Sequence, residues 1–409
     1  MLIMAGGAAL LSGCREPAAP AAAALTTPVP DLLLIERGTE VVRLAGDRLD
    51  DLGDRALPSM GAAAEVYAAT ASADVTTVHS TDPGSGRRTT RGELRGRWHL
   101  RAVSADGRAC ALADSPPEPT GGPPAGRARS VLTVLGPAGE RRLELPGVIE
   151  PDAFTTDRTG LFVLQWLPAA APDRYRVRLL DLATGTLTPL LTRAKTPVPA
   201  GAEEEMRGAG RRAVLSPNRD VLYTLYTHQG QHRHTRDLIA ARPGGVHAFV
   251  HVLHLEQRWA YCLDLPHPFG EGPAAGHTVA LDPTGRRLFV ADLTSGTLAR
   301  ADTQNLTVTG VSAVPAATGT AEAAVGPAGR SVYVAAGTLL TVVDAATGEP
   351  TARWTVAQPI RGLGVSADGR RLHVGSVGAV SWLDATTGAL LGRAPVPGMT
   401  ALREVRDRA

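Results

Sequence analysis

The sequence is poor in cysteine, lysine and aromatic residues. Three cysteines stand among 409 residues, aromatic residues make up 4% of the chain, and Lys195 is the only lysine. So few cysteines exclude a small fold held together by a disulfide framework. The 42 basic residues are nearly balanced by 40 acidic ones, which gives a net charge of +2. Without a basic stripe, no nucleic-acid partner is expected.

The chain also lacks the short motifs of nucleotide and ester chemistry. It has no Gly-x-Ser-x-Gly elbow and no Walker loop. A loose dinucleotide fingerprint at residues 208–213 precedes a predicted strand, so it would offer a pyrophosphate no helix N-terminus. The aspartates of residues 47–54 lack the spacing of a calcium loop and indicate a solvated hairpin. No catalytic residue is therefore predicted.

Two repeated turn signatures are the most informative feature that the chain does have. In Asp-x-x-Thr/Ser-Gly, the aspartate can accept backbone N–H bonds and the glycine supplies the positive φ that closes a short hairpin. This signature occurs at residues 82–86, 181–185, 292–296, 344–348 and 384–388. A companion turn occurs at residues 104–107, 156–160, 216–219, 282–285, 326–329 and 366–369. An apolar segment follows nearly every one, as expected for antiparallel strands.

This periodicity predicts an all-β fold, a single β-propeller of four-stranded blades over residues 31–409. Seven blades are expected at residues 58–98, 99–148, 149–199, 200–269, 270–314, 315–357 and 358–397. One more blade is expected to combine N-terminal strands at 32–35 and 40–44 with a C-terminal strand at 399–405. Such sharing would close the ring and remove a free sheet edge. Seven and eight blades both fit, and eight is favoured.

The N-terminus resembles a bacterial lipoprotein signal over residues 1–14. A short apolar run ends in Leu11-Ser12-Gly13-Cys14, which is similar to a lipobox, although the basic segment that usually precedes the run is missing. The run is too short to span a bilayer. Residues 15–30 are rich in proline and alanine and predict a tether. We therefore expect Cys14 to carry a lipid that anchors the protein at the extracytoplasmic face of the cell membrane.

Histidine is concentrated in the fifth blade, where eight of the eleven histidines fall between residues 228 and 277. Residues 228–245 form an insertion that is expected to project from the ring and to offer cationic donors to an anionic ligand. His247 and His251 are expected on one face of a strand at 246–255. The candidate ligand-binding residues are His228, His232, His234, Arg236, His247 and His251.

Metal binding by these histidines stays open at this point. Two imidazoles on one face suit a transition metal or an anion. However, no aspartate, glutamate or cysteine completes a ligand set at a standard spacing, so a solvated loop is the simpler interpretation and the cofactor is undetermined. Cys110 and Cys262 fall in non-adjacent blades and are expected to be buried without a disulfide.

Three segments of the fifth blade, residues 223–226, 247–253 and 258–266, resemble exported β-propeller proteins of actinobacteria. These are related to proteins with YVTN- and TolB-like repeats, a WD40-like architecture. The propeller resemblance covers residues 31–409. It implies the fold and export, and it adds no catalytic residue because the group has no established activity.

Two classes of function fit these observations. The first is a monomeric, lipid-anchored binding or scaffold module that presents the loop-rich face of its ring to an envelope protein, peptide or glycan. The alternative is an extracytoplasmic propeller enzyme, lactonase-like or dehydrogenase-like, with a site at the mouth of the central channel. The side chains that line the channel would help to separate the two.

Overall fold

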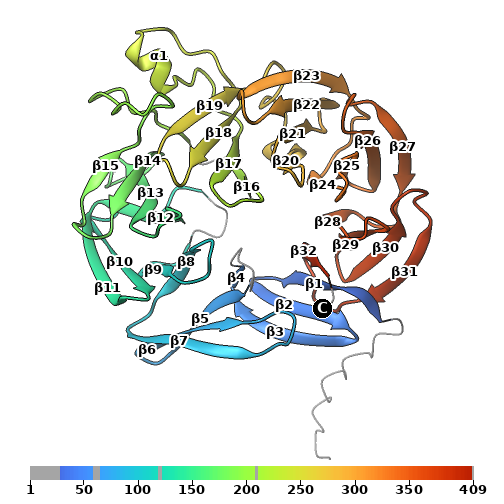
Figure 1. The fold of residues 1–409 in the computed structure, drawn as a ribbon, viewed down its shortest axis with the longest axis horizontal. Helices are drawn as coiled ribbons and strands as arrows, with labels where there is room; N and C mark the ends of the chain where they lie inside the picture. Colours follow the sequence, from blue (N-terminus) through green and yellow to red (C-terminus); the bar gives the residue numbers. More distant parts are fainter. Residues whose placement is uncertain (1–27, 59–64, 118–121, 208–210, 408–409) are drawn as a thin grey trace, which may run out of the picture.

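Eight four-stranded antiparallel sheets stand around a common axis in the computed structural model, which describes residues 28–58, 65–117, 122–207 and 211–407 (Figure 1). This arrangement confirms the predicted all-β propeller and the count of eight blades. One strand of each blade lies nearest the axis, and the other three follow outward toward the rim.

The strands are numbered along the chain. Blade one contains β1 (Val29–Arg37), β2 (Glu40–Gly46), β3 (Arg48–Asp54) and β32 (Ala401–Arg406), and blade two contains β4 (Leu57–Pro58), β5 (Val66–Ser72), β6 (Val75–Thr81) and β7 (Arg88–Arg95). Blade three contains β8 (His99–Val103), β9 (Cys110–Ala113), β10 (Arg129–Gly136) and β11 (Gly139–Pro146), and blade four contains β12 (Val148–Phe154), β13 (Gly160–Leu167), β14 (Arg174–Asp181) and β15 (Leu187–Pro189). Blade five contains β16 (Arg212–Leu215), β17 (Val221–Tyr226), β18 (Phe249–His254) and β19 (Ala260–Asp264), and blade six contains β20 (His277–Leu281), β21 (Arg287–Asp292), β22 (Thr297–Asp302) and β23 (Thr307–Ala313). Blade seven contains β24 (Glu322–Val325), β25 (Ser331–Ala336), β26 (Leu339–Asp344) and β27 (Pro350–Thr355), and blade eight contains β28 (Ile360–Val365), β29 (Arg371–Ser376), β30 (Ala379–Asp384) and β31 (Leu390–Pro395).

The aspartate turns work as their chemistry predicts. The Asp181 carboxylate accepts the backbone N–H groups of Ala183 at 2.9 Å and Thr184 at 2.7 Å. Gly185 has a φ of 77° and donates its N–H to the Asp181 carbonyl at 2.8 Å. Aspartate and glycine thus form the connection between β14 and β15. The same hydrogen bonds form in the turns at 344–348 and 384–388.

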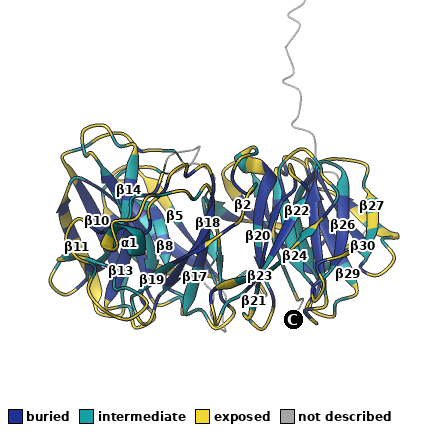
Figure 2. Cartoon of the chain, turned by 90° about the horizontal axis from the view of Figure 1, so that it is seen from above, coloured by how far each residue is buried: buried dark blue, intermediate teal, exposed yellow. Residues whose placement is uncertain are grey.

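The hydrophobic core lies between the blades. Within the described ranges, buried apolar side chains form eight clusters, one for each pair of neighbouring blades. A middle strand such as β13 is therefore buried over most of its length, because its sheet packs against a neighbour on each face. Seen from the side, buried residues fill the strands, while exposed residues lie on the outer strands and connecting loops (Figure 2).

The two ends of the described chain close the ring. In blade one, β1 pairs with β32, with Leu33 opposite Val405 and Ile35 opposite Leu402. The predicted sharing of one blade between N- and C-terminal strands is therefore confirmed. Because β1 begins at Val29, the last residues of the predicted tether already belong to the first strand.

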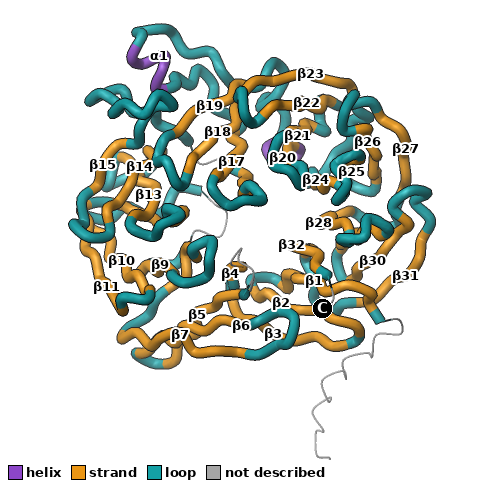
Figure 3. The backbone as a smooth tube through the Cα atoms, in the orientation of Figure 1, coloured by secondary structure: helices purple, strands orange, loops and turns teal. Residues whose placement is uncertain are grey.

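Helices are few in the described part of the chain, which contains the short α1 (Thr235–Ile239) and a 3₁₀ turn, η1 (Ala274–Gly276) (Figure 3). Neither has the length and apolar character that crossing a bilayer requires. Helix α1 belongs to the connection between β17 and β18, residues 227–248, which is called the blade-five insertion below. Cys14 and the lipobox lie outside the described residues, so lipid anchoring stays a prediction.

Candidate metal centre in blade five

The blade-five insertion folds back onto its own blade. Gln229 is buried, and its side-chain amide donates to the carbonyls of Arg207 at 2.9 Å and Thr227 at 3.1 Å. Its oxygen accepts the Arg207 N–H at 3.0 Å. Gly244 permits the close return of the chain, because a Cβ there would lie 2.3 Å from the Gln231 carbonyl oxygen. The insertion is therefore tied to the segment that leads into β16.

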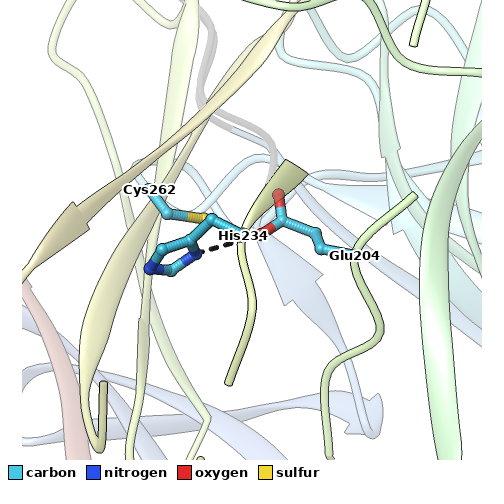
Figure 4. Close-up of side chains that lie close together, drawn as sticks. All are labelled: Glu204, His234 and Cys262. Carbon is cyan, nitrogen blue, oxygen red and sulfur yellow. Dashed lines mark hydrogen bonds and ion pairs between the residues drawn. The ribbon is translucent and has the colours of Figure 1, made fainter. Parts of the chain in front are cut away.

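This fold-back brings together a carboxylate, two imidazoles and a thiol. Oxygen Oε2 of Glu204 lies 3.1 Å from Nδ1 of His234 and 3.3 Å from Nε2 of His232. The Cys262 thiol donates to the same oxygen at 3.2 Å. Donor atoms of Glu204, His234 and Cys262 all lie within 4.8 Å of one another (Figure 4). Three different types of metal-binding group therefore converge on one point.

A second set of contacts fixes the orientation of this group. Nε2 of His234, the nitrogen that faces away from Glu204, lies 2.7 Å from Oδ1 of Asp264, although not along a straight N–H···O line. Arg236 of α1 forms an ion pair with Asp264 and donates to the Cys262 carbonyl at 2.7 Å. Helix α1 is thereby fastened to the outermost strand, β19.

The cluster is largely buried and lines a cavity of about 140 Å³. The side chains of Glu204 and His234 are 11% and 2% exposed, and Cys262 is 2% exposed. His251 of β18 also lines the cavity, and burial lowers the pKa of its imidazole. His251 therefore favours the neutral form, the form that can bind a metal.

The charges in the cluster depend on one another. Burial would raise the pKa of Glu204, but hydrogen bonds with His232 and His234 outweigh it and lower that pKa far below its usual range. Burial opposes protonation of His234, yet contacts with Asp264 and Glu204 raise its pKa. Burial, followed by the charge of Glu204, raises the pKa of the Cys262 thiol well above its ordinary value. The carboxylate is thus held ionised while the thiol beside it keeps its proton.

The structure groups some of the predicted ligand-binding residues and separates others. His232, His234, Arg236 and His251 gather at the cluster or its cavity, whereas His228 and His247 are exposed outside it. The expectation that the insertion projects from the ring is wrong for His232 and His234, which are 6% and 2% exposed, because Gln229 ties this segment down. His247 also precedes β18 and does not share a strand face with His251.

A second, larger pocket of about 540 Å³ opens on the channel side of blades one to four. Its charged side chains are paired, Arg101 with Glu150 and Arg211 with Asp152. The described residues that line it include no histidine, serine or cysteine. It is a polar pocket in which these charges compensate one another.

Comparison with solved structures supports the fold. No protein-family model matches the chain, and no curated protein is similar to it in sequence. The apo structure of AztD from Citrobacter koseri is 13% identical with a TM-score of 0.54, over 93% of this chain and 98% of that one. The dihydro-heme d1 dehydrogenase NirN is 17% identical with a TM-score of 0.52, over 98% of this chain and 78% of that one. Sqt1 of Saccharomyces cerevisiae is 10% identical with a TM-score of 0.50, over 91% of this chain and 90% of that one. At such low identity, these similarities establish the β-propeller fold and nothing finer.

Proposed function

We propose that the protein is an extracytoplasmic binding propeller, anchored to the membrane by a lipid on Cys14, and that its blade-five site binds a transition-metal ion. Zn²⁺ is the ion that fits best. The observation that carries the proposal is the convergence of Glu204, His234 and Cys262 on one buried point. A protein, peptide or glycan partner for the faces of the ring stays a prediction.

The spacing of the donor atoms supports a metal ion. Zinc bonds of about 2.0 to 2.3 Å place neighbouring donors of a tetrahedron about 3.3 to 3.8 Å apart. The contacts of Glu204 Oε2 with His234 Nδ1 and Cys262 Sγ, at 3.1 and 3.2 Å, are close to that range. A mixed set of thiolate, imidazole and carboxylate suits Zn²⁺ better than Ca²⁺ or Mg²⁺, which prefer oxygen.

The surroundings of the three donors support the same proposal. Metal-binding histidines commonly direct their other ring nitrogen at a carboxylate, which orients the ring. Asp264 stands in that position beside His234, and Arg236 holds Asp264. A thiol is a weak hydrogen-bond donor, so Cys262 gains little from Glu204 alone, whereas its thiolate would be a strong zinc ligand.

Cobalt titration tests the metal site. The parent protein is expected to bind one Co²⁺ per chain, with a near-ultraviolet thiolate-to-cobalt charge-transfer band, and Zn²⁺ should displace it. Cys262→Ser should abolish the band and weaken Zn²⁺ binding roughly 100-fold or more, because one of the three side chains that bind the ion directly is lost. Cys110→Ser is the matched control, since Cys110 is also a buried, free cysteine but lies in blade three. No cobalt binding by the parent, or an unchanged band in folded Cys262→Ser, would contradict the proposal.

Fractionation tests the anchor separately. Replacing Cys14 with serine removes the thiol that a lipid would modify, so the variant is expected to leave the membrane fraction and appear in the soluble extracytoplasmic fraction. Cys110→Ser is again the control and should stay with the membrane. If Cys14→Ser stays in the membrane fraction as firmly as the parent, the lipid anchor is wrong, whatever the result for the metal.

A further inference from the structure

The blade-five site has one donor fewer than a closed tetrahedral site. Among the described residues, the mutually close donor set consists of Glu204, His234 and Cys262. His232 lies outside that set: its Nε2 faces the Glu204 carboxylate at 3.3 Å, and its ring packs against the rings of His234 and Phe249. It is thus placed to orient Glu204 rather than to complete the coordination. Zinc sites with three protein ligands use the fourth position for water or an exogenous ligand.

The cavity beside the donors provides a place for such a ligand. Its volume of about 140 Å³ is comparable to the roughly 150 Å³ cavity that holds benzene in another protein. Its walls include the donors themselves, together with Arg193 and Thr192 after β15 and Ile239 of α1. Arg193 and Ile239 are both exposed, so the cavity reaches the surface at the rim of the ring.

The charge at the mouth of the cavity favours an anion. Arg193 donates to the carbonyls of Asn305 at 3.2 Å and Gln304 at 3.0 Å, and its guanidinium lies 5.5 Å from the centre of the Tyr261 ring. None of these three partners carries a negative charge. Arg236, by contrast, is neutralised by Asp264. One positive charge at the mouth is therefore uncompensated and attracts anions.

We infer that a metal ion in the blade-five site keeps one coordination position for an exogenous ligand that enters through this cavity, and that the preferred ligand is a small carboxylate. The inference rests on the proposed metal-binding function. It makes the site one that exchanges a ligand, and not one that serves only to hold the insertion in place. The carboxylate supplies an oxygen donor to the ion, and Arg193 compensates the charge that it brings.

The test uses the full-length protein saturated with Co²⁺, whose d–d absorption bands respond to a change of ligand. Titration with acetate is expected to shift these bands along a saturable curve with one acetate per cobalt. Arg193→Gln should weaken acetate binding about 3- to 10-fold, because one nearby positive charge is removed. Arg233→Gln is the matched control, since Arg233 is an exposed arginine of the blade-five insertion that does not line the cavity, and this variant should bind acetate as the parent does.

The other outcomes distinguish metal binding at the blade-five site from binding of a carboxylate to that metal. If cobalt binds but acetate leaves the spectrum unchanged, the inference is overturned and the metal-binding function stands. If only His251→Ala responds to acetate, His251 is the fourth ligand in the parent, which also overturns the inference. If Arg193→Gln and Arg233→Gln weaken acetate binding equally, the assigned role of Arg193 is overturned. If the parent does not bind cobalt at all, both the metal-binding function and the inference that rests on it are overturned.

Discussion

Removal of residues 398–409 is expected to lower the free energy of unfolding by more than about 5 kcal/mol, a loss comparable to the whole stability of many domains. The deletion takes away β32 and exposes an edge of β1 that is otherwise paired. It also removes Met399 and Leu402, which are 0% and 5% exposed in the core between blades eight and one. Each large-to-small change at such a site typically costs about 2 to 5 kcal/mol. Urea unfolding followed by circular dichroism measures the effect.

Two further variants keep this prediction testable if the shortened chain does not fold. Leu402→Ala leaves the strand in place and should cost about 2 to 4 kcal/mol, because it opens a cavity in the same core. Removal of residues 407–409 alone leaves β32 intact, since that strand ends at Arg406, and should change stability by less than about 0.5 kcal/mol. If the longer deletion unfolds at the same urea concentration as the parent, β32 does not close the ring.

The ring could be predicted from sequence because its strongest signals are local. Each aspartate turn carries its own hydrogen-bond acceptor and its own glycine, so a stretch such as residues 181–185 specifies a hairpin without help from distant parts of the chain. Blade two carries a weaker local signal than the other blades. Its first strand, β4, has two residues, and β5 ends in small, exposed residues, so neither gives a clear apolar pattern. Its place is set by packing between blades one and three.

The candidate site could be predicted only in part, because its members come from three separate segments. The histidines were noticeable since they are rare and crowded, but Glu204 lies 28 residues before His232 and Cys262 lies 58 residues after Glu204. Glu204 also stands in a run of three glutamates. Its two neighbours pair with arginines of β14, and Glu204 alone contacts the histidines. Nothing in the run distinguishes the middle residue, and long-range packing makes the choice.

A buried ion-pair network joins the first blade to the last at the seam of the ring. Asp31 of β1 is 3% exposed, and its carboxylate lies 2.6 Å from Nε2 of His373 on β29. Arg371, also on β29, donates to both oxygens of Asp31 at 2.9 and 3.1 Å. Burial would raise the pKa of Asp31, but hydrogen bonds with His373 and Arg371 outweigh it and lower that pKa to about 2.

Asp31→Asn is therefore expected to lower the free energy of unfolding at pH 7 by about 2 to 4 kcal/mol, because it leaves the buried His373 and the partly exposed Arg371 without their charged acceptor. The control is Asp368→Asn, which removes the partly exposed carboxylate 3.4 Å from the same arginine and should cost less than about 1 kcal/mol.

The stability that Asp31 contributes should decrease as the pH falls. Its pKa is lower in the folded protein than the ordinary 3.8, so its contribution is complete above about pH 4 and is lost as the pH falls toward about 2. Urea unfolding of parent and Asp31→Asn at pH 7, 4 and 3 should show a difference that narrows at the lowest pH. A difference that is absent at pH 7, or that grows on acidification, would mean that the ionised Asp31 does not stabilise the seam.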